Sequence, residues 1–226
     1  MARDFKTRLS RRATKAGLFL DENLTTALAS YFDLLARWNR KINLTALDSS
    51  DEAIDRLLLE PIVAARVVTG SGARELVDIG SGGGSPAIPL ALALGPDVRL
   101  TMVEVKARKS AFLREAIRHL RLPQAAVETS RYEELLARPE LLEKFDLLSM
   151  RAVRVDPRVL MTLQAFVKPG GQVLLFRGAA GPDAPQVIHP LHWEATVPLL
   201  EPLQSRLSVL RKRSVPRGTL ARSGGP

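Results

Sequence analysis

Residues 76–84 read Leu76-Val77-Asp78-Ile79-Gly80-Ser81-Gly82-Gly83-Gly84, a short apolar run that ends in a cluster of glycines. Such a run, bounded by glycine, is typical of a buried strand that ends in a tight turn. Glycine has no Cβ, so the backbone at this turn can approach a ligand closely. The stretch therefore predicts a strand with a ligand-binding loop at its carboxyl end.

Short apolar runs alternate with helix-length segments on both sides of this strand. We expect strands at Glu75–Ile79, Arg99–Val105, Ala125–Glu128, Phe145–Ser149 and Gln172–Arg177. We expect helices near residues 86–94, 107–121, 131–143 and 156–168. Connections of this length join parallel strands. The pattern therefore predicts an α/β fold with a mostly parallel sheet.

The two ends of the chain have other patterns. A helix-period stripe follows Asp21, and a second helix begins near Ser50, with Pro61 expected to kink it or to open a new helix. The runs His192–Leu199 and Arg206–Arg213 predict a terminal antiparallel hairpin. We therefore divide the chain into a helical extension (1–70), a core (71–213) and a flexible tail (214–226).

The charge balance raises the question of a polyanionic partner. Lys and Arg number 33 against 24 Asp and Glu, which gives a formal net charge of +9. Arginine, which pairs bidentately with phosphate, dominates the cations. A nucleic-acid partner and an ordinary basic surface both remain open. The basic start, Arg3–Lys15, is either a phosphate-binding arm or a solvated helical face.

Several classes of protein are excluded by what is missing. The sequence has no cysteine, which rules out a disulfide framework and a thiolate nucleophile, and it has three histidines, so we expect no metal. No apolar run reaches the roughly 20 residues of a membrane helix. We expect a cytoplasmic protein that acts as a monomer.

An acidic residue at the end of the next predicted strand, Glu104, completes a candidate cofactor site. Glu104 ends the second predicted strand, where a carboxylate can accept hydrogen bonds from ribose hydroxyls. NAD fits poorly, because its fingerprint needs a glycine where Ser85 stands and Asp78 would face a pyrophosphate. S-adenosylmethionine (SAM) carries positive charge and no phosphate, so it tolerates both residues.

This arrangement resembles the class I SAM-dependent methyltransferases, a Rossmann-like group. The resemblance implies a third adenosine contact at the helix start after the third strand, here Tyr132 and Glu133. The candidate cofactor residues are then Asp78, Gly80, Ser81, Gly82, Gly83, Gly84, Ser85, Glu104, Tyr132, Glu133 and Arg151.

The residues that are present and absent limit which atom could accept the methyl group. Methylation of pyrimidine C5 through a covalent adduct needs a cysteine. Amino-group methyltransferases usually carry Asn/Asp-Pro-Pro-aromatic where this chain has Ser149-Met150-Arg151-Ala152. A ring nitrogen such as guanine N7 has a free lone pair and no proton to lose, so it needs alignment but no general base. A basic site without a histidine suits such an acceptor.

The segment Trp38-Asn39-Arg40-Lys41-Ile42-Asn43-Leu44-Thr45-Ala46 resembles the N-terminal signature of the glucose-inhibited division protein B family. The likeness extends over residues 16–213. It implies methylation of guanine N7 in small-subunit ribosomal RNA. It also implies catalytic roles for two arginines: Arg151 would orient the cofactor or guanine, and Arg177 would contact RNA phosphate or a base edge.

The same resemblance suggests secondary roles and exposes departures. Arg3–Lys15 and Arg206–Arg213 would add phosphate contacts, and Glu60 could supply an acid that the family often has before the core. The family usually has Gly-Phe-Pro-Gly where this chain has Gly84-Ser85-Pro86-Ala87, and Ser where Met150 stands. Two alternatives therefore stay open: a methyltransferase for another RNA site, and a non-catalytic RNA-binding relative.

Overall fold

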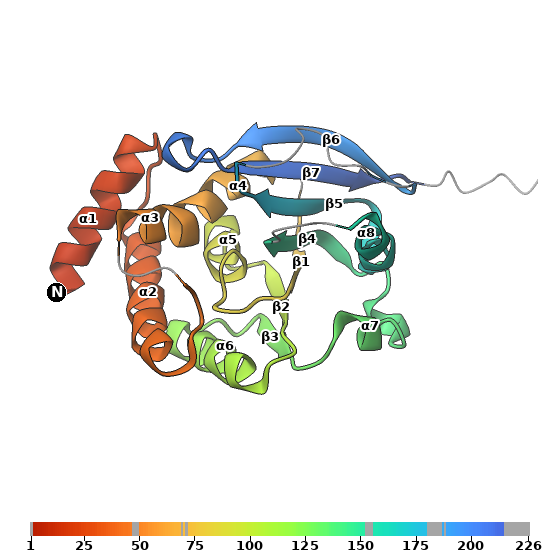
Figure 1. Cartoon of the computed structure of the whole chain (residues 1–226), viewed down its shortest axis with the longest axis horizontal. Coiled ribbons are helices and arrows are strands. Elements are labelled where there is room, and N and C mark those ends of the chain that lie inside the picture. Colours follow the sequence, from red (N-terminus) through yellow and green to blue (C-terminus); the bar gives the residue numbers. More distant parts are fainter. Residues whose placement is uncertain are drawn as a thin grey trace, which may run out of the picture.

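The computed structural model describes residues 2–46, 50–68, 70, 72–151, 156–179, 187 and 189–214. Its centre is a seven-stranded sheet with strand order β3-β2-β1-β4-β5-β7-β6 (Figure 1). The strands are β1 (Glu75–Ile79), β2 (Arg99–Val103), β3 (Ala125–Glu128), β4 (Phe145–Arg151), β5 (Val167–Arg177), β6 (Leu191–Pro198) and β7 (Arg206–Lys212). Strands β1 to β5 pair with one another in parallel, which confirms the mostly parallel α/β fold.

The predicted terminal hairpin is confirmed, and its second strand, β7, lies between β5 and β6. Strand β7 pairs antiparallel with both β5 and β6, so β6 forms the edge. β5 begins at Val167, five residues before the predicted start, because Pro169-Gly170-Gly171 continues the strand. Gly171 has no room for a side chain, since a Cβ there would lie 2.9 Å from the Asp146 carbonyl oxygen of β4.

The crossover helices are α5 (Ala87–Leu94), α6 (Ala107–Leu120), α7 (Tyr132–Leu135) and α8 (Pro157–Leu163). The prediction of one helix over residues 131–143 is wrong. The chain forms the single turn α7 and then a 3₁₀ turn at Pro139–Leu141. Arg138 precedes a proline, which disfavours the helical backbone at that residue, so α7 ends before it.

The N-terminal segment forms helices α1 (Ala2–Lys15), α2 (Glu22–Ile42), α3 (Asp51–Ile54) and α4 (Glu60–Val68). Asp21 caps α2 by accepting a 2.7 Å hydrogen bond from the Leu24 backbone N–H. Instead of a kink at Pro61, a π-helical turn over Asp55–Leu59 joins α3 to α4. Arg3–Lys15 lie within α1, which confirms a helix there, and a role of this segment in phosphate binding stays a prediction.

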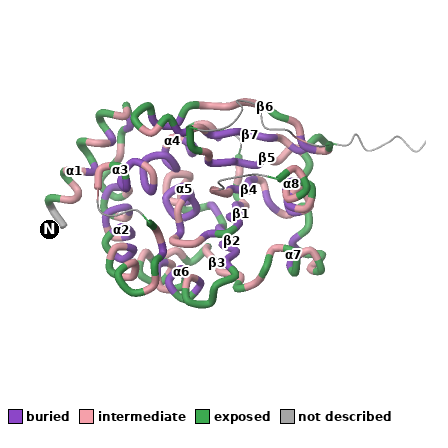
Figure 2. Tube along the Cα trace, in the orientation of Figure 1, coloured by how far each residue is buried: buried purple, intermediate pink, exposed green. Residues whose placement is uncertain are grey.

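Apolar side chains of the N-terminal helices and of the sheet share one core. Leu76, Leu147 and Phe176 on one face of the sheet pack in the same cluster as Leu9 of α1 and Leu28 of α2. A second cluster on the opposite face includes Val77, Leu148, Leu175 and Leu160 of α8. Figure 2 shows these buried strands enclosed by exposed helix surfaces. The division of the chain at residues 70 and 213 stays a prediction.

Candidate active site at the carboxyl edge of the sheet

Strand alternation places four polar side chains on the face of the sheet that α2, α4 and α5 cover. Asp78 is two residues after Leu76, Ser149 and Arg151 follow Leu147 at the same period, and Glu104 follows Met102. Asp78 and Ser149 are direct partners in the register of β1 and β4. The sequence therefore brings two acids, a hydroxyl and an arginine to one edge.

The glycine loop turns at this edge and is tied to β2. The backbone N–H groups of Gly80 and Ser81 donate to the Val103 carbonyl oxygen at 2.9 and 3.0 Å. Gly80 has a φ of +73° and open space where a Cβ would be, whereas a Cβ on Gly84 (φ +87°) would lie 2.7 Å from Ile88 Cδ1. Gly80 therefore leaves room for a ligand, and Gly84 allows the loop to pack on α5.

Glu104 joins the loop to the end of β2. One carboxylate oxygen accepts from the Gly82 N–H at 2.9 Å and the other from the Lys106 N–H at 2.8 Å. The side chain is almost fully buried. Each carboxylate oxygen can accept a second hydrogen bond. Glu104 therefore orders the loop and still has capacity for hydroxyl donors.

Asp78 lies beneath the loop and is only partly satisfied. Ser149 Oγ donates to Asp78 Oδ1 at 2.6 Å, whereas Oδ2 is buried and has no hydrogen-bond partner. Burial raises the pKa of Asp78 to about 6, and the hydrogen bond from Ser149 opposes that rise. An unpartnered buried carboxylate oxygen is costly, so this position favours a ligand that brings a donor or a positive charge.

Arg151 is held in one orientation at the end of β4. Its Nη1 donates to Glu60 Oε2 at 2.5 Å, and its Nη2 donates to the Arg56 carbonyl oxygen at 2.9 Å. The guanidinium carbon lies 5.0 Å from the centre of the Phe176 ring. Glu60 is fully buried, and Arg151 supplies the opposite charge beside its carboxylate. The acid predicted before the core is thus the partner of Arg151.

Pro61 leaves a backbone carbonyl of the π-helical turn free to accept a hydrogen bond from a site residue. Proline has no N–H, and residue 61 of a helix would otherwise donate back to the carbonyl of residue 57. The Leu57 carbonyl instead accepts from Ser85 Oγ at 2.8 Å, and the neighbouring Arg56 carbonyl accepts from Arg151. Ser85, a departure from the family pattern, therefore fastens the glycine loop to this turn.

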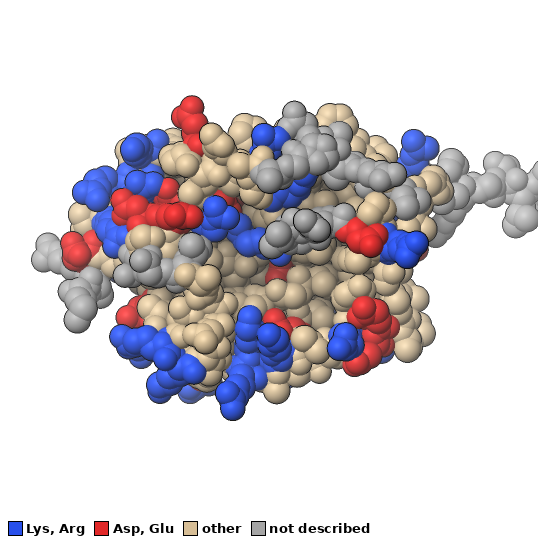
Figure 3. All heavy atoms as spheres, viewed as in Figure 1, with Lys and Arg blue, Asp and Glu red and all other residues tan. Residues whose placement is uncertain are grey.

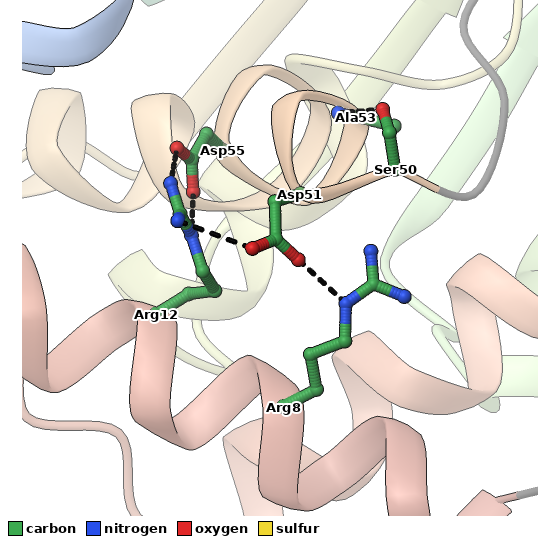
Figure 4. Close-up of polar contacts among 6 residues, drawn as sticks. All are labelled: Arg8, Arg12, Ser50, Asp51, Ala53 and Asp55. Atoms are coloured by element: carbon green, nitrogen blue, oxygen red, sulfur yellow. Dashed lines mark hydrogen bonds and ion pairs between the residues drawn. The ribbon is translucent and has the colours of Figure 1, made fainter.

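The same turn is fixed from its other end by α1. Arg12 forms two hydrogen bonds to Asp55, the first residue of the π-helical turn, and a third to Asp51 at 3.2 Å (Figure 4). Arg8 Nε donates to Asp51 Oδ1 at 2.6 Å. Ser50 caps α3 by accepting from the Ala53 N–H at 3.2 Å. The N-terminal helix is therefore connected to the site through Asp55.

Tyr31 is a site residue that sequence reasoning counted only as part of an apolar stripe. Its hydroxyl donates to the Gly83 carbonyl oxygen at 2.6 Å, and its side chain is fully buried. Burial raises the pKa of this phenol well above its ordinary value, so it stays protonated. The available signal was a residue with a polar tip at a helix position that faces the core.

The other predicted site residues are more dispersed. Arg177 lies on the opposite face of the sheet from Arg151, since it follows Leu175 by two positions, and its Nη1 donates to Ser208 Oγ at 3.1 Å. Tyr132 begins α7 and packs against the second cluster, and Glu133 beside it is exposed. Ala152 lies outside the described residues. The edge thus gathers Asp78, Gly80, Ser81, Gly82, Ser85, Glu104 and Arg151.

The basic segments predicted to meet phosphate include several cations with partners inside the fold. Arg8 and Arg12 of α1 bind aspartates of the next helices. In β7, Arg211 pairs with Glu194 at 2.7 Å and Lys212 with Glu143 at 2.8 Å. The side chain of Arg3 lies outside the described residues. Intramolecular pairing therefore accounts for much of the charge in both segments.

Neither a membrane-spanning helix nor a group of side chains suited to a metal occurs in the part of the chain that the structure describes. No described helix combines the length and apolarity needed to cross a bilayer. No three or more described His, Asp or Glu side chains gather as metal ligands would.

Comparison with known proteins identifies relatives over most of the chain. Residues 24–186 match the model of the family GidB, described as rRNA small subunit methyltransferase G. The Ribosomal RNA small subunit methyltransferase G of Xanthomonas axonopodis pv. citri is 37% identical over 82% of this chain and 82% of its own. The protein of that name from Xylella fastidiosa is 36% identical over 87% of this chain and 91% of its own.

Solved structures share the fold at low sequence identity. An O-methyltransferase from Bacillus cereus in complex with SAH superposes with a TM-score of 0.62 at 17% identity, covering 94% of this chain and 100% of that chain. Identity this low supports the Rossmann-like architecture alone.

Proposed function

The chain belongs to the GidB family of small-subunit rRNA methyltransferases, and from this membership we propose that it transfers a methyl group from SAM to N7 of a guanine in small-subunit ribosomal RNA. The reaction would take place at the carboxyl edge of the sheet, in the cytoplasm and with the protein as a monomer. The observation that carries the site assignment is the buried, unpartnered Asp78 Oδ2 beside an open glycine loop.

The residues at this edge fit SAM better than a phosphate-bearing cofactor. Asp78 and Glu104 are both almost fully buried, and two acids this close would repel a pyrophosphate. Asp78 Oδ2 can meet a positive charge or a donor, and Glu104 can accept from both ribose hydroxyls. Gly80 leaves the space that the ligand needs.

The chain's own residues would align the reactants. When bound, SAM supplies an electrophilic methyl group. Guanine N7 attacks with a lone pair and releases no proton, so the site needs no base. The three histidines lie in other elements: His119 of α6 bonds Ser30 on α2, His189 is in the turn before β6, and His192 is in β6. Arg151, fixed by Glu60 and Phe176, would orient the cofactor or the base.

The remaining assignments follow the same proposal. Gly83, Gly84 and Tyr31 would shape the loop, and Ser85 would hold it against the π-helical turn. Tyr132 and Glu133 would meet the adenosine from the far side of the loop. Arg177 would contact RNA from the opposite face of the sheet.

Methyl transfer from radiolabelled SAM into deproteinised small-subunit rRNA and into isolated small subunits tests this function. We expect label in one guanine, located by chemical cleavage at N7-methylguanine. Label at another nucleotide would favour a different RNA site. RNA binding without transfer by either substrate, in a folded protein, would favour a non-catalytic relative.

A further inference from the structure

A groove of about 370 Å³ lies along the end of α2, with Glu115 of α6 on its other side, and it has no role in the proposed methyl transfer. Its lining residues are Leu34, Arg37, Trp38, Arg40, Lys41, Ile42 and Glu115. An aromatic ring, aliphatic side chains, three cations and the Glu115 carboxylate, which pairs with Arg118, therefore surround a space in the size range of small-ligand pockets. We refer to it as the α2–α6 groove.

The α2–α6 groove lies at the carboxyl-terminal end of α2. The two helices are antiparallel neighbours, because Ser30 bonds His119 at 2.8 Å and the Trp38 ring lies 5.8 Å from that of Phe112. The end of α2 thus lies near the start of α6. A Cβ on Gly82 would be 3.9 Å from Lys109 Nζ of α6, so the basic start of α6 reaches the loop.

Most cations around the groove and at the start of α6 have no internal partner; the exception is Arg37, whose Nε pairs with the exposed Asp33 of the same helix at 3.2 Å. In the part of the chain that the structure describes, these side chains make no hydrogen bond or ion pair: Arg40, Lys41, Lys106, Arg108 and Lys109. Figure 3 shows Lys and Arg gathered over the lower part of α2 and α6, whereas red and blue are interleaved over α1 and α3. Unneutralised cations beside an aromatic ring are the chemistry that binds single-stranded nucleic acid.

We propose that the α2–α6 groove binds an unpaired stretch of the ribosomal RNA substrate next to the target guanine. A base lies against Trp38, and the adjoining phosphates contact Arg40 and Lys41. RNA is recognised mainly through unstacked bases and aromatic platforms, which suits a groove with one aromatic wall. The inference rests on the proposed function, because it takes the bound RNA to be the substrate.

The first test compares two double variants of equal charge change. Arg40→Gln/Lys41→Gln removes two groove cations, and Arg74→Gln/Arg121→Gln removes two exposed cations at the amino edge of the sheet. We expect the groove variant to bind deproteinised small-subunit rRNA about tenfold more weakly, with a flatter salt dependence, and the control to bind like wild type. SAM affinity should be unchanged in both. Equal losses in the two variants would overturn the groove assignment.

The second test measures the fluorescence of Trp38. The chain has two tryptophans, and Trp193 is exposed on β6, so Trp193→Phe leaves Trp38 as the single indole reporter. Titration with an unlabelled oligouridylate should quench its emission, with the same midpoint as RNA binding. RNA binding without any change in emission would overturn the stacking contact.

The two tests fail independently of the proposed function. Wild-type methylation of rRNA combined with unaltered binding and transfer by Arg40→Gln/Lys41→Gln would reject the groove and leave the methyltransferase. Selective loss of RNA binding in the groove variant, with no transfer by wild type, would support the groove and reject the proposed reaction.

Discussion

Two basic regions of this molecule use their charge in opposite ways. In the network of α1 and α3, Arg8 and Arg12 are bound to Asp51 and Asp55 (Figure 4). Around the α2–α6 groove, Arg40 and the cations at the start of α6 have no partner among the described residues. A formal charge of +9 does not distinguish them. The position of carboxylates in the fold does, since a neutralised arginine stabilises structure and an unneutralised one attracts an anion.

The paired arginines also do more than hold helices together. Asp55 begins the π-helical turn whose carbonyls accept from Ser85 and whose continuation carries Glu60 to Arg151. A chain of contacts therefore runs from α1 to the site. The comparison predicts that replacing a paired arginine lowers stability, whereas replacing a groove cation lowers RNA affinity.

The largest effect is expected at Arg151, which has the most buried partner. Arg151→Ala leaves Glu60 as an uncompensated buried carboxylate, and we expect the free energy of unfolding to fall by about 3–5 kcal/mol in urea denaturation. Arg177→Ala is the matched control, because it loses only a hydrogen bond to Ser208 and should cost about 1 kcal/mol. Equal losses of unfolding free energy in the two variants would mean that Arg151 does not compensate the buried Glu60 carboxylate.

A somewhat smaller loss is expected at Arg12. Its hydrogen bonds to Asp55 raise its pKa above the ordinary value, and the Asp55 side chain is almost fully buried. Arg12→Ala should lower the free energy of unfolding by about 3 kcal/mol. Arg11→Ala, at an exposed position of the same helix, should change it by no more than about 0.5 kcal/mol. A small loss at Arg12 would show that the network is a surface pair.

Reversing one charge in the groove should affect binding and leave stability nearly constant. Arg37→Glu removes the exposed ion pair with Asp33 and places a carboxylate four residues before Lys41, so one i,i+4 pair on the helix surface replaces another while a groove cation is lost. We expect RNA affinity to fall about tenfold and the unfolding free energy to change by less than about 0.5 kcal/mol. Arg74→Glu supplies the same reversal at the amino edge, and a similar fall there would contradict the comparison.

The smallest effect is expected at the exposed end of the α1 network. The hydrogen bond from Arg8 lowers the pKa of Asp51, whose side chain is 43% exposed. A carboxyl with a lowered pKa stabilises the folded state above its unfolded value of 3.8, and this contribution is lost as the pH falls through the folded pKa. Asp51→Asn should therefore cost less than about 1 kcal/mol at neutral pH and nothing in strong acid. A cost that persists in acid would point to a packing effect.

Local patterns were sufficient to predict the sheet and much of its edge. Strand β1 has the predicted bounds, because an apolar run closed by glycines is a local signal. Asp78 and Glu104 could be placed together because parallel strands end at the same edge. The same reasoning did not show on which face of the sheet Arg151 and Arg177 lie. Arg151 and Arg177 lie on opposite faces because the register of β4 and β5 pairs Arg151 with Phe176, one position before Arg177, and this register is not encoded in a local pattern.

Contacts between distant segments were beyond the reach of sequence patterns. Arg12 and Asp55 are 43 residues apart, and nothing local indicates that they meet. The π-helical turn before Pro61 depends on donors from Ser85 and Arg151, which lie in other elements. Tyr31 matched an apolar stripe, and its hydroxyl bond to Gly83 became visible only in three dimensions.

Calorimetric titration with SAM, for wild type and for Asp78→Asn, tests the site assignment most directly. Burial raises the pKa of Asp78 to about 6, so the carboxylate is mostly ionised at about pH 7.5 and mostly protonated at about pH 5. We predict that wild type binds SAM more tightly at the higher pH, and that Asp78→Asn binds weakly with little pH dependence. A folded wild-type protein that binds no SAM, or an Asp78→Asn variant with wild-type affinity at both pH values, would contradict the account.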